Sequence, residues 1–152
     1  MSDLRELYQE VILDHNRSPR NFGALDPCDH KADGHNPLCG DTVTVYLTIA
    51  DGIVSDVAFD GRGCAISVAS ASMMTEMVKG MTVNDAERLF HSFQHLCTED
   101  TEPEVPAGLE DEMDVLQVLS GVRAFPMRVK CATLAWHTMS AALHGDRETS
   151  TE

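Results

Sequence analysis

The stretch Thr42-Val-Thr-Val-Tyr-Leu-Thr-Ile49 decides the fold, because β-branched and aromatic residues fill most of it. Residues of these types favour extended backbone, so the stretch predicts a β-strand. Ala50-Asp51-Gly52 follows it as a hairpin turn signal, since glycine tolerates the positive φ that tight turns need. Residues 53–59 then alternate between apolar and polar types well enough to return as a second strand. The centre of the chain therefore predicts an antiparallel hairpin.

Helical patterns surround this hairpin on both sides. A capping pattern, Thr82 followed three residues later by Asp85, marks the start of one helix. The expected helices span residues 4–13, 64–78, 83–96, 110–119 and 127–143, and the weakly patterned residues 24–36 are assigned no element. This order predicts an α+β fold in which the helices pack on one face of a small antiparallel sheet.

The chain length of 152 residues is typical of one domain, and we expect residues 1–145 to form it. Gly145 ends the last predicted helix. Beyond it, the polar residues 146–152 predict a frayed tail.

Acidic residues outnumber basic ones, with 25 Asp and Glu against 11 Lys and Arg for a net charge of −14. Eight of these acids lie in residues 98–114, which hold no Lys or Arg. A strongly acidic balance argues against nucleic acid or an anionic membrane as a partner. No apolar run reaches the roughly 18 residues of a membrane span, and the first ten residues lack a signal-peptide pattern. We therefore expect a cytoplasmic protein with no membrane partner.

Three of the five cysteines occupy places that favour the thiolate form. Cys39 lies in a turn before a strand with Asp41 two residues on, and Cys64 lies at a predicted helix start. Cys131 follows Arg128 and Lys130 at the beginning of the last helix. Helix N-termini and neighbouring cations lower the pKa of a thiol. All five are widely spaced, so no disulfide framework is indicated.

The other two cysteines, Cys28 and Cys97, have acidic neighbours that disfavour a thiolate, and we interpret them as inert. Three thiolates and one carboxylate suit Zn²⁺ in tetrahedral coordination, and thiolates also suit iron–sulfur clusters. The spacing contains no Cys-x-x-Cys pair. From the residues alone, a metal site and three unrelated cysteines remain alternatives.

Three motifs together resemble one known family. They are Asn36-Pro-Leu-Cys-Gly-Asp41, Gly61-Arg-Gly-Cys-Ala-Ile-Ser67 and Arg128-Val-Lys-Cys-Ala-Thr-Leu-Ala-Trp136, and Ser18-Pro-Arg-Asn-Phe-Gly23 adds to them. In this order they resemble the U-type iron–sulfur cluster assembly proteins over about residues 3–143. The resemblance implies a single SufU/IscU-like domain with a SufE/NifU-like fold.

Three departures from the IscU-type pattern make the chain similar to the SufU branch. Lys130 stands where IscU-type scaffolds carry a His before the third cysteine. Phe125-Pro-Met-Arg-Val-Lys130 stands in place of their Leu-Pro-Pro-Val-Lys segment. The stretch between Cys64 and Cys131 is also longer, and the extra part resembles an acidic insertion near residues 98–120.

Resemblance to SufU implies one zinc ion held by Cys39, Asp41, Cys64 and Cys131. It further implies that Cys39 accepts sulfane sulfur from a SufS-type cysteine desulfurase and passes it toward downstream iron–sulfur assembly proteins. Arg128 matches a residue important for work with the desulfurase, so Cys39 and Arg128 are the candidate catalytic residues of a sulfurtransferase-type activity. In that family the desulfurase offers a His to the zinc in place of the acceptor cysteine.

Two other functions remain open at this stage. One is a scaffold that binds iron or a [2Fe–2S] cluster through the same ligands and hands it on. The other is a fold stabilised by zinc without sulfur chemistry of its own.

Overall fold

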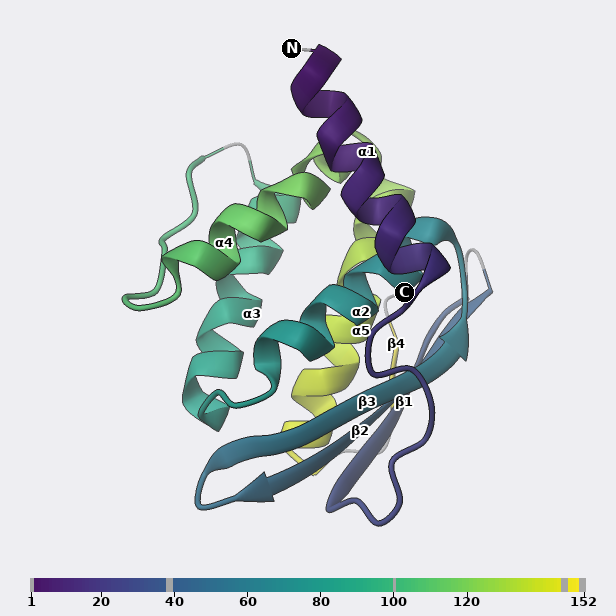
Figure 1. The fold of residues 1–152 in the computed structure, drawn as a ribbon, viewed down its shortest axis with the longest axis vertical. Coiled ribbons are helices and arrows are strands. Elements are labelled where there is room, and N and C mark those ends of the chain that lie inside the picture. The colour runs from purple at the N-terminus through teal and green to yellow at the C-terminus, as the bar shows by residue number, and fades with distance from the viewer. Residues whose placement is uncertain (1, 38–39, 100, 146–147, 151–152) are drawn as a thin grey trace.

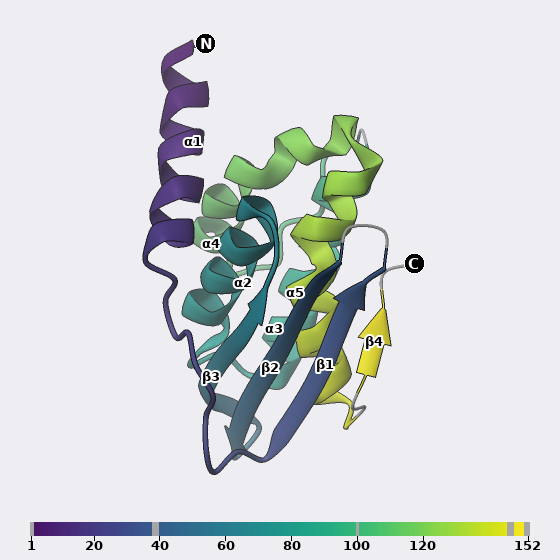
Figure 2. The ribbon, with the colours of Figure 1, turned by 90° about the vertical axis from the view of Figure 1, so that its right-hand side faces the viewer.

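The computed structural model describes residues 2–37, 40–99, 101–145 and 148–150. Helices cover one face of a four-stranded sheet, and none of the described helices lies on the other face (Figures 1 and 2). The strands are β1 His30–Asn36, β2 Asp41–Ala50, β3 Ile53–Arg62 and β4 Glu148–Ser150, in the spatial order β3-β2-β1-β4. The helices are α1 Ser2–Arg17, α2 Ala65–Val78, α3 Val83–Thr98, α4 Glu110–Leu116 and α5 Pro126–Leu143, with a 3₁₀ helix η1 at Gln117–Ala124.

The predicted central hairpin is present and forms the middle of the sheet. β2 and β3 pair in antiparallel register, and Asp51 and Gly52 both adopt positive φ at the turn between them. Val43, Val45 and Leu47 of β2 point into the core, which lies between the sheet and the helices. The predicted α+β class, with helices on one face of a small sheet, is confirmed.

Strand β1 is missing from the sequence-based prediction. It pairs antiparallel with β2 over its whole length, although its sequence carries almost no large apolar residues. Its inward positions are Ala32, Gly34 and Asn36, so the alternation of burial involves small and polar side chains. At Gly34 a Cβ atom would overlap the side chain of Thr138 on α5. Because the strand packs so closely against α5, its inward positions hold small or polar residues. The alternation of large apolar residues that would have predicted a strand is therefore absent.

Strand β4 lies in the segment that was predicted to be a frayed tail. Residues 148–150 pair in parallel with Asp33–His35 of β1. The outer edge of β1 presents backbone N–H and C=O groups, and a short strand can satisfy them whatever its side chains are. The sheet accordingly has one parallel edge strand in addition to its three antiparallel strands.

Helix boundaries mostly follow the expected capping residues. The hydroxyl of Thr82 accepts a hydrogen bond from the Asp85 amide at 3.0 Å and caps α3, as predicted. The helix predicted over residues 110–119 ends earlier, at Leu116, and the chain continues as the 3₁₀ helix η1 to Ala124. None of the described helices is long and apolar enough to cross a membrane.

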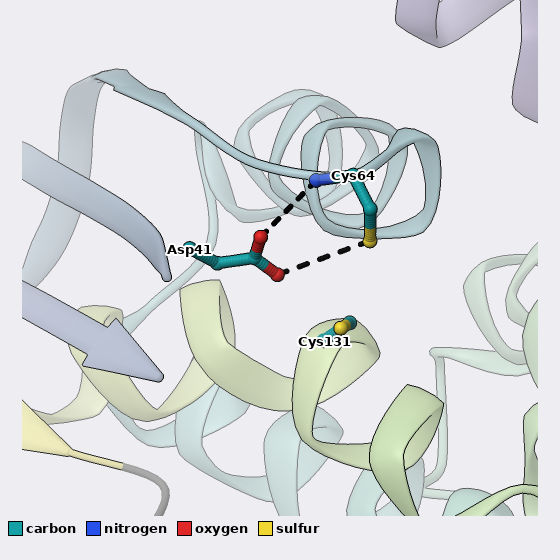
Figure 3. Close-up of side chains that lie close together, drawn as sticks. All are labelled: Asp41, Cys64 and Cys131. Carbon is teal, nitrogen blue, oxygen red and sulfur yellow. Dashed lines mark hydrogen bonds between the residues drawn. The ribbon is translucent and has the colours of Figure 1, made fainter. Parts of the chain in front are cut away.

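The layers of the protein are arranged around α5. This helix packs on β1 and β2, α2 packs on β3 and α5, and α3 packs on the outer side of α5. Trp136 of α5 and Phe93 of α3 are fully buried, with ring centroids 5.0 Å apart. The first turns of α2 and α5 meet near the ends of β2 and β3, so residues from distant parts of the sequence come together at this corner (Figure 3).

Candidate metal centre

Asp41, Cys64 and Cys131 meet at the corner where the strands and the two central helices come together (Figure 3). Asp41 is the first residue of β2, Cys64 precedes α2, and Cys131 lies in the second turn of α5. One ligand atom of each side chain lies within 4.8 Å of the other two. Asp41 and Cys131 are buried, whereas Cys64 is exposed. The cluster is therefore held in the fold on one side and open to solvent on the other.

Asp41 is fixed by the residue that it faces. Its Oδ1 accepts a hydrogen bond from the Cys64 amide at 3.2 Å, and its Oδ2 lies 3.8 Å from the Cys64 Sγ. Gly63 makes this approach possible, because a Cβ atom there would lie 2.8 Å from Oδ1 of Asp41. This steric role of Gly63 was not predicted, because it depends on contact with Asp41, which is distant in the sequence.

Cys64 caps α2 in addition to facing the cluster. Its Sγ accepts a hydrogen bond from the Ser67 amide at 3.5 Å, so the sulfur lies at the positive end of the helix dipole. The predicted position of Cys64 at a helix start is confirmed.

The donor set and its dimensions fit a zinc ion. Zn²⁺ binds thiolate sulfur at about 2.3 Å and carboxylate oxygen at about 2.1 Å, so two such ligands of a tetrahedral site lie about 3.6 Å apart. The Asp41–Cys64 distance of 3.8 Å is close to this value. Two sulfurs and one oxygen leave one position of a tetrahedron for a fourth ligand.

Cys39, the predicted fourth ligand and sulfur acceptor, lies outside the described residues. Its neighbour Gly40 is described, with a positive φ and an amide that donates to the Asn36 carbonyl at 2.9 Å. Of the four predicted ligands, the structure describes three and brings those three together.

Arg128, the predicted partner-facing residue, is exposed one turn before Cys131. Its guanidinium carbon lies 5.4 Å from the centre of the Phe125 ring. Phe125 and Met127 are also exposed, so an apolar and cationic surface borders the cluster. The nearby cation Arg123 instead donates two hydrogen bonds to the Leu96 carbonyl and joins η1 to α3.

The two cysteines predicted to be inert lie outside the cluster. Cys97 is fully buried on α3, and this burial raises the pKa of its thiol to about 12. Cys28 is half-buried in the segment before β1. His91 and His95 lie on α3, where they approach the carboxylates of Glu87 and Glu99, four residues away along the chain. No histidine belongs to the metal-type cluster found in the described part of the chain.

Comparison with known proteins identifies the family. The model of the NifU-like N-terminal domain matches residues 7–132. The chain belongs to this family. It is 38% identical to the zinc-dependent sulfurtransferase SufU of Bacillus subtilis (strain 168), over 91% of this chain and 90% of that protein. It is 35% identical to the iron–sulfur cluster assembly scaffold protein IscU of Streptococcus pyogenes serotype M1, over 94% of this chain and 86% of that protein.

A solved structure of a related protein shares the NifU-like fold. The crystal structure of an iron–sulfur cluster assembly scaffold protein for the SUF system from Fervidobacterium islandicum AW-1 superimposes with a TM-score of 0.77. The superposition covers 88% of this chain and 94% of that chain, and the two sequences are 31% identical. The resemblance found in the three sequence motifs is thereby confirmed at the level of family and fold.

Proposed function

We propose that the protein is a zinc-dependent sulfur acceptor that takes persulfide sulfur from a SufS-type cysteine desulfurase for iron–sulfur cluster assembly in the cytoplasm. The observation that carries the proposal is the convergence of Asp41, Cys64 and Cys131 from three separate elements. The relative named a zinc-dependent sulfurtransferase, matched along most of both chains, supports the same function.

The proposed zinc ligands are Cys39, Asp41, Cys64 and Cys131. Bound zinc would keep the thiolates deprotonated at neutral pH and protect them from oxidation. Cys64 at the α2 N-terminus and Cys131 within α5 belong to rigid elements, and the Cys64 amide orients Asp41. Cys39 lies between β1 and β2 in the sequence. We therefore assign Cys64, Cys131 and Asp41 to holding the metal and Cys39 to reacting.

In the proposed transfer, the Cys39 thiolate attacks the terminal sulfur of the desulfurase persulfide. A new S–S bond forms at Cys39, the S–S bond of the desulfurase breaks, and the desulfurase cysteine leaves as a thiolate. The sulfane sulfur moves without net oxidation or reduction, so no further reagent is required. The product is a Cys39 persulfide, which downstream assembly proteins receive.

Docking of the desulfurase is assigned to the surface beside Cys131. Arg128 supplies a fixed positive charge there, and the exposed Phe125 and Met127 supply apolar area next to it. Because aromatic residues and arginine are enriched at the centres of protein interfaces, this combination supports a partner role for Arg128.

A second candidate function is a scaffold for a [2Fe–2S] cluster on the same ligands. The observation that favours it is the match to IscU scaffold proteins at 35–36% identity over most of the chain. Thiolate ligands suit iron–sulfur clusters as well as zinc.

Desulfurase turnover separates these functions. Protein purified without oxygen is analysed for zinc, iron and sulfide, and is then added to a SufS-type desulfurase with cysteine as substrate. We expect one zinc per chain and a strong stimulation that Cys39→Ala abolishes, with Cys28→Ala as the matched control that retains it. Arg128→Ala is expected to keep its zinc and lose the stimulation. Iron and sulfide without stimulation would instead support the scaffold function.

A further inference from the structure

A buried hydrogen-bond bridge joins the two helices that carry the cysteines of the cluster. The hydroxyl of Ser70 on α2 donates to the Ala132 carbonyl on α5 at 2.5 Å. The same oxygen accepts a hydrogen bond from the indole N–H of Trp136 at 3.2 Å. We call these three residues the Ser70 clasp.

Each member of the clasp is fully buried. Ser70, Ala132 and Trp136 all have 0% of their surface exposed. A polar group without a partner at such a depth is strongly disfavoured, so the hydroxyl is held in this one bridging arrangement. The Trp136 ring is held in turn against Phe93 of α3, with the centroids 5.0 Å apart.

The clasp lies close in the chain to both sulfur ligands. Ala132 directly follows Cys131 on α5, and Ser70 lies six residues after Cys64 on α2. At about 1.5 Å per residue, Ser70 is about 9 Å along α2 from Cys64. A contact at this point restrains how α2 lies against α5, and so restrains how far apart the two thiols are.

We propose that Ser70 is a positioning residue that sets the separation of the Cys64 and Cys131 thiols through its bridge to Ala132 and Trp136. The consequence for zinc affinity rests on the proposed function, whereas the consequence for thiol separation does not. Some residues orient metal ligands without binding the metal themselves. Replacing such a residue typically lowers the affinity for the metal by about 10- to 100-fold.

Ser72 provides a matched control on the same helix. It is also fully buried, but its hydroxyl faces α1 and the segment after it, where it contacts Nδ1 of His15 at 2.7 Å and accepts from the Arg20 amide at 2.8 Å. Ser72→Ala therefore removes a buried hydroxyl from α2 without touching α5. A general loss of stability affects both serine variants, and a loss of thiol positioning affects only Ser70→Ala.

The first measurement uses the metal-free full-length chain with Cys28 and Cys39 replaced by serine. A short bifunctional thiol reagent is added, and the Cys64–Cys131 cross-link is followed by peptide mass spectrometry. We expect Ser70→Ala to slow cross-linking at least fivefold and Ser72→Ala to stay within twofold of the parent. The second measurement is zinc affinity of the otherwise unmodified chain by chelator competition, with an expected 10- to 100-fold loss for Ser70→Ala alone.

Trp136→Phe is a second variant. It keeps an aromatic ring at this position and the Ser70–Ala132 hydrogen bond but removes the indole N–H donor. We expect cross-linking and zinc affinity to change in the same direction as in Ser70→Ala, but less. Equal cross-linking and equal zinc affinity in Ser70→Ala and Ser72→Ala would overturn the proposal. A parent protein that binds no zinc, together with selectively slowed cross-linking in Ser70→Ala, would contradict the proposed function and leave the clasp supported.

Discussion

Two buried cysteines on neighbouring helices lie in very different surroundings. Cys97 on α3 is enclosed by the apolar core, and burial raises the pKa of its thiol to about 12. Cys131 on α5 is almost as buried, but it lies beside Asp41 and Cys64. Burial alone makes a thiol unreactive, because the thiolate loses its hydration. Burial next to other ligand atoms is instead what a metal site requires.

The largest expected contrast is in chemical reactivity. With a pKa of about 12, the Cys97 thiol is ionised in roughly one molecule in 10⁴ at pH 8. We expect iodoacetamide to label exposed Cys64 of the metal-free protein at least 100 times faster than Cys97. Time-resolved peptide mass spectrometry gives the two rates, and denatured protein serves as the control in which they become similar. Comparable rates in the folded state would contradict the distinction between the cysteines of the cluster and the buried Cys97.

The next contrast is in metal binding. Cys64→Ser and Cys131→Ser each remove a predicted ligand and should weaken zinc binding by roughly 100-fold or more. Cys97→Ala should leave zinc affinity within about twofold, because Cys97 lies outside the cluster. Zinc content after dialysis against a chelator measures the difference. Loss of zinc from Cys97→Ala in a folded protein would contradict the assignment.

A smaller effect is expected from crowding the carboxylate. In Gly63→Ala the new methyl would lie 2.8 Å from Oδ1 of Asp41, so the carboxylate or the strand end must shift. We expect a 10- to 100-fold loss of zinc affinity with little loss of secondary structure. Gly121→Ala is the matched control, because nothing lies within 4 Å of its Cβ position. An unchanged affinity for Gly63→Ala would show that Asp41 is not held by this close approach.

The smallest expected effect concerns a buried histidine, His15, whose ionisation is disfavoured by burial as that of the Cys97 thiol is. Burial, followed by the charge of Arg20, lowers the pKa of His15, while Glu76 and Asp14 oppose the shift. The unfolded chain therefore binds more protons than the folded one between pH 6.5 and the lower pKa of the folded state, and stability falls as the pH drops through this window. One histidine contributes at most about 1.4 kcal/mol per pH unit. Chemical denaturation between pH 5 and 8 should show a flatter profile for His15→Gln, and an identical profile would contradict this role.

Sequence reasoning found the parts of the fold that carry an apolar or capping signal. The β2–β3 hairpin and the Thr82 cap of α3 are examples, since each depends on local residue types. It missed β1, whose buried positions are small or polar because α5 packs closely against Gly34. It also missed β4, where pairing depends on the backbone of β1.

The candidate site was predicted in a similar way. Cys64 and Cys131 could each be placed by a predicted helix start, and the family motifs grouped them with Asp41. The space provided by Gly63 and the bridge through Ser70 could not be predicted, because both depend on contacts between elements that are distant in the sequence. Local chemistry was visible in the sequence, whereas the distances that make a site were not.

X-ray absorption at the zinc edge of protein purified without oxygen tests the central claim most directly. The proposed ligand set of three cysteines and one aspartate predicts three sulfurs at about 2.3 Å and one oxygen at about 2.1 Å around a single zinc ion. Cys131→Ser should lower the sulfur count, and Cys97→Ala should not. A zinc ion with only nitrogen and oxygen ligands, or iron with sulfide in its place, would contradict the claim.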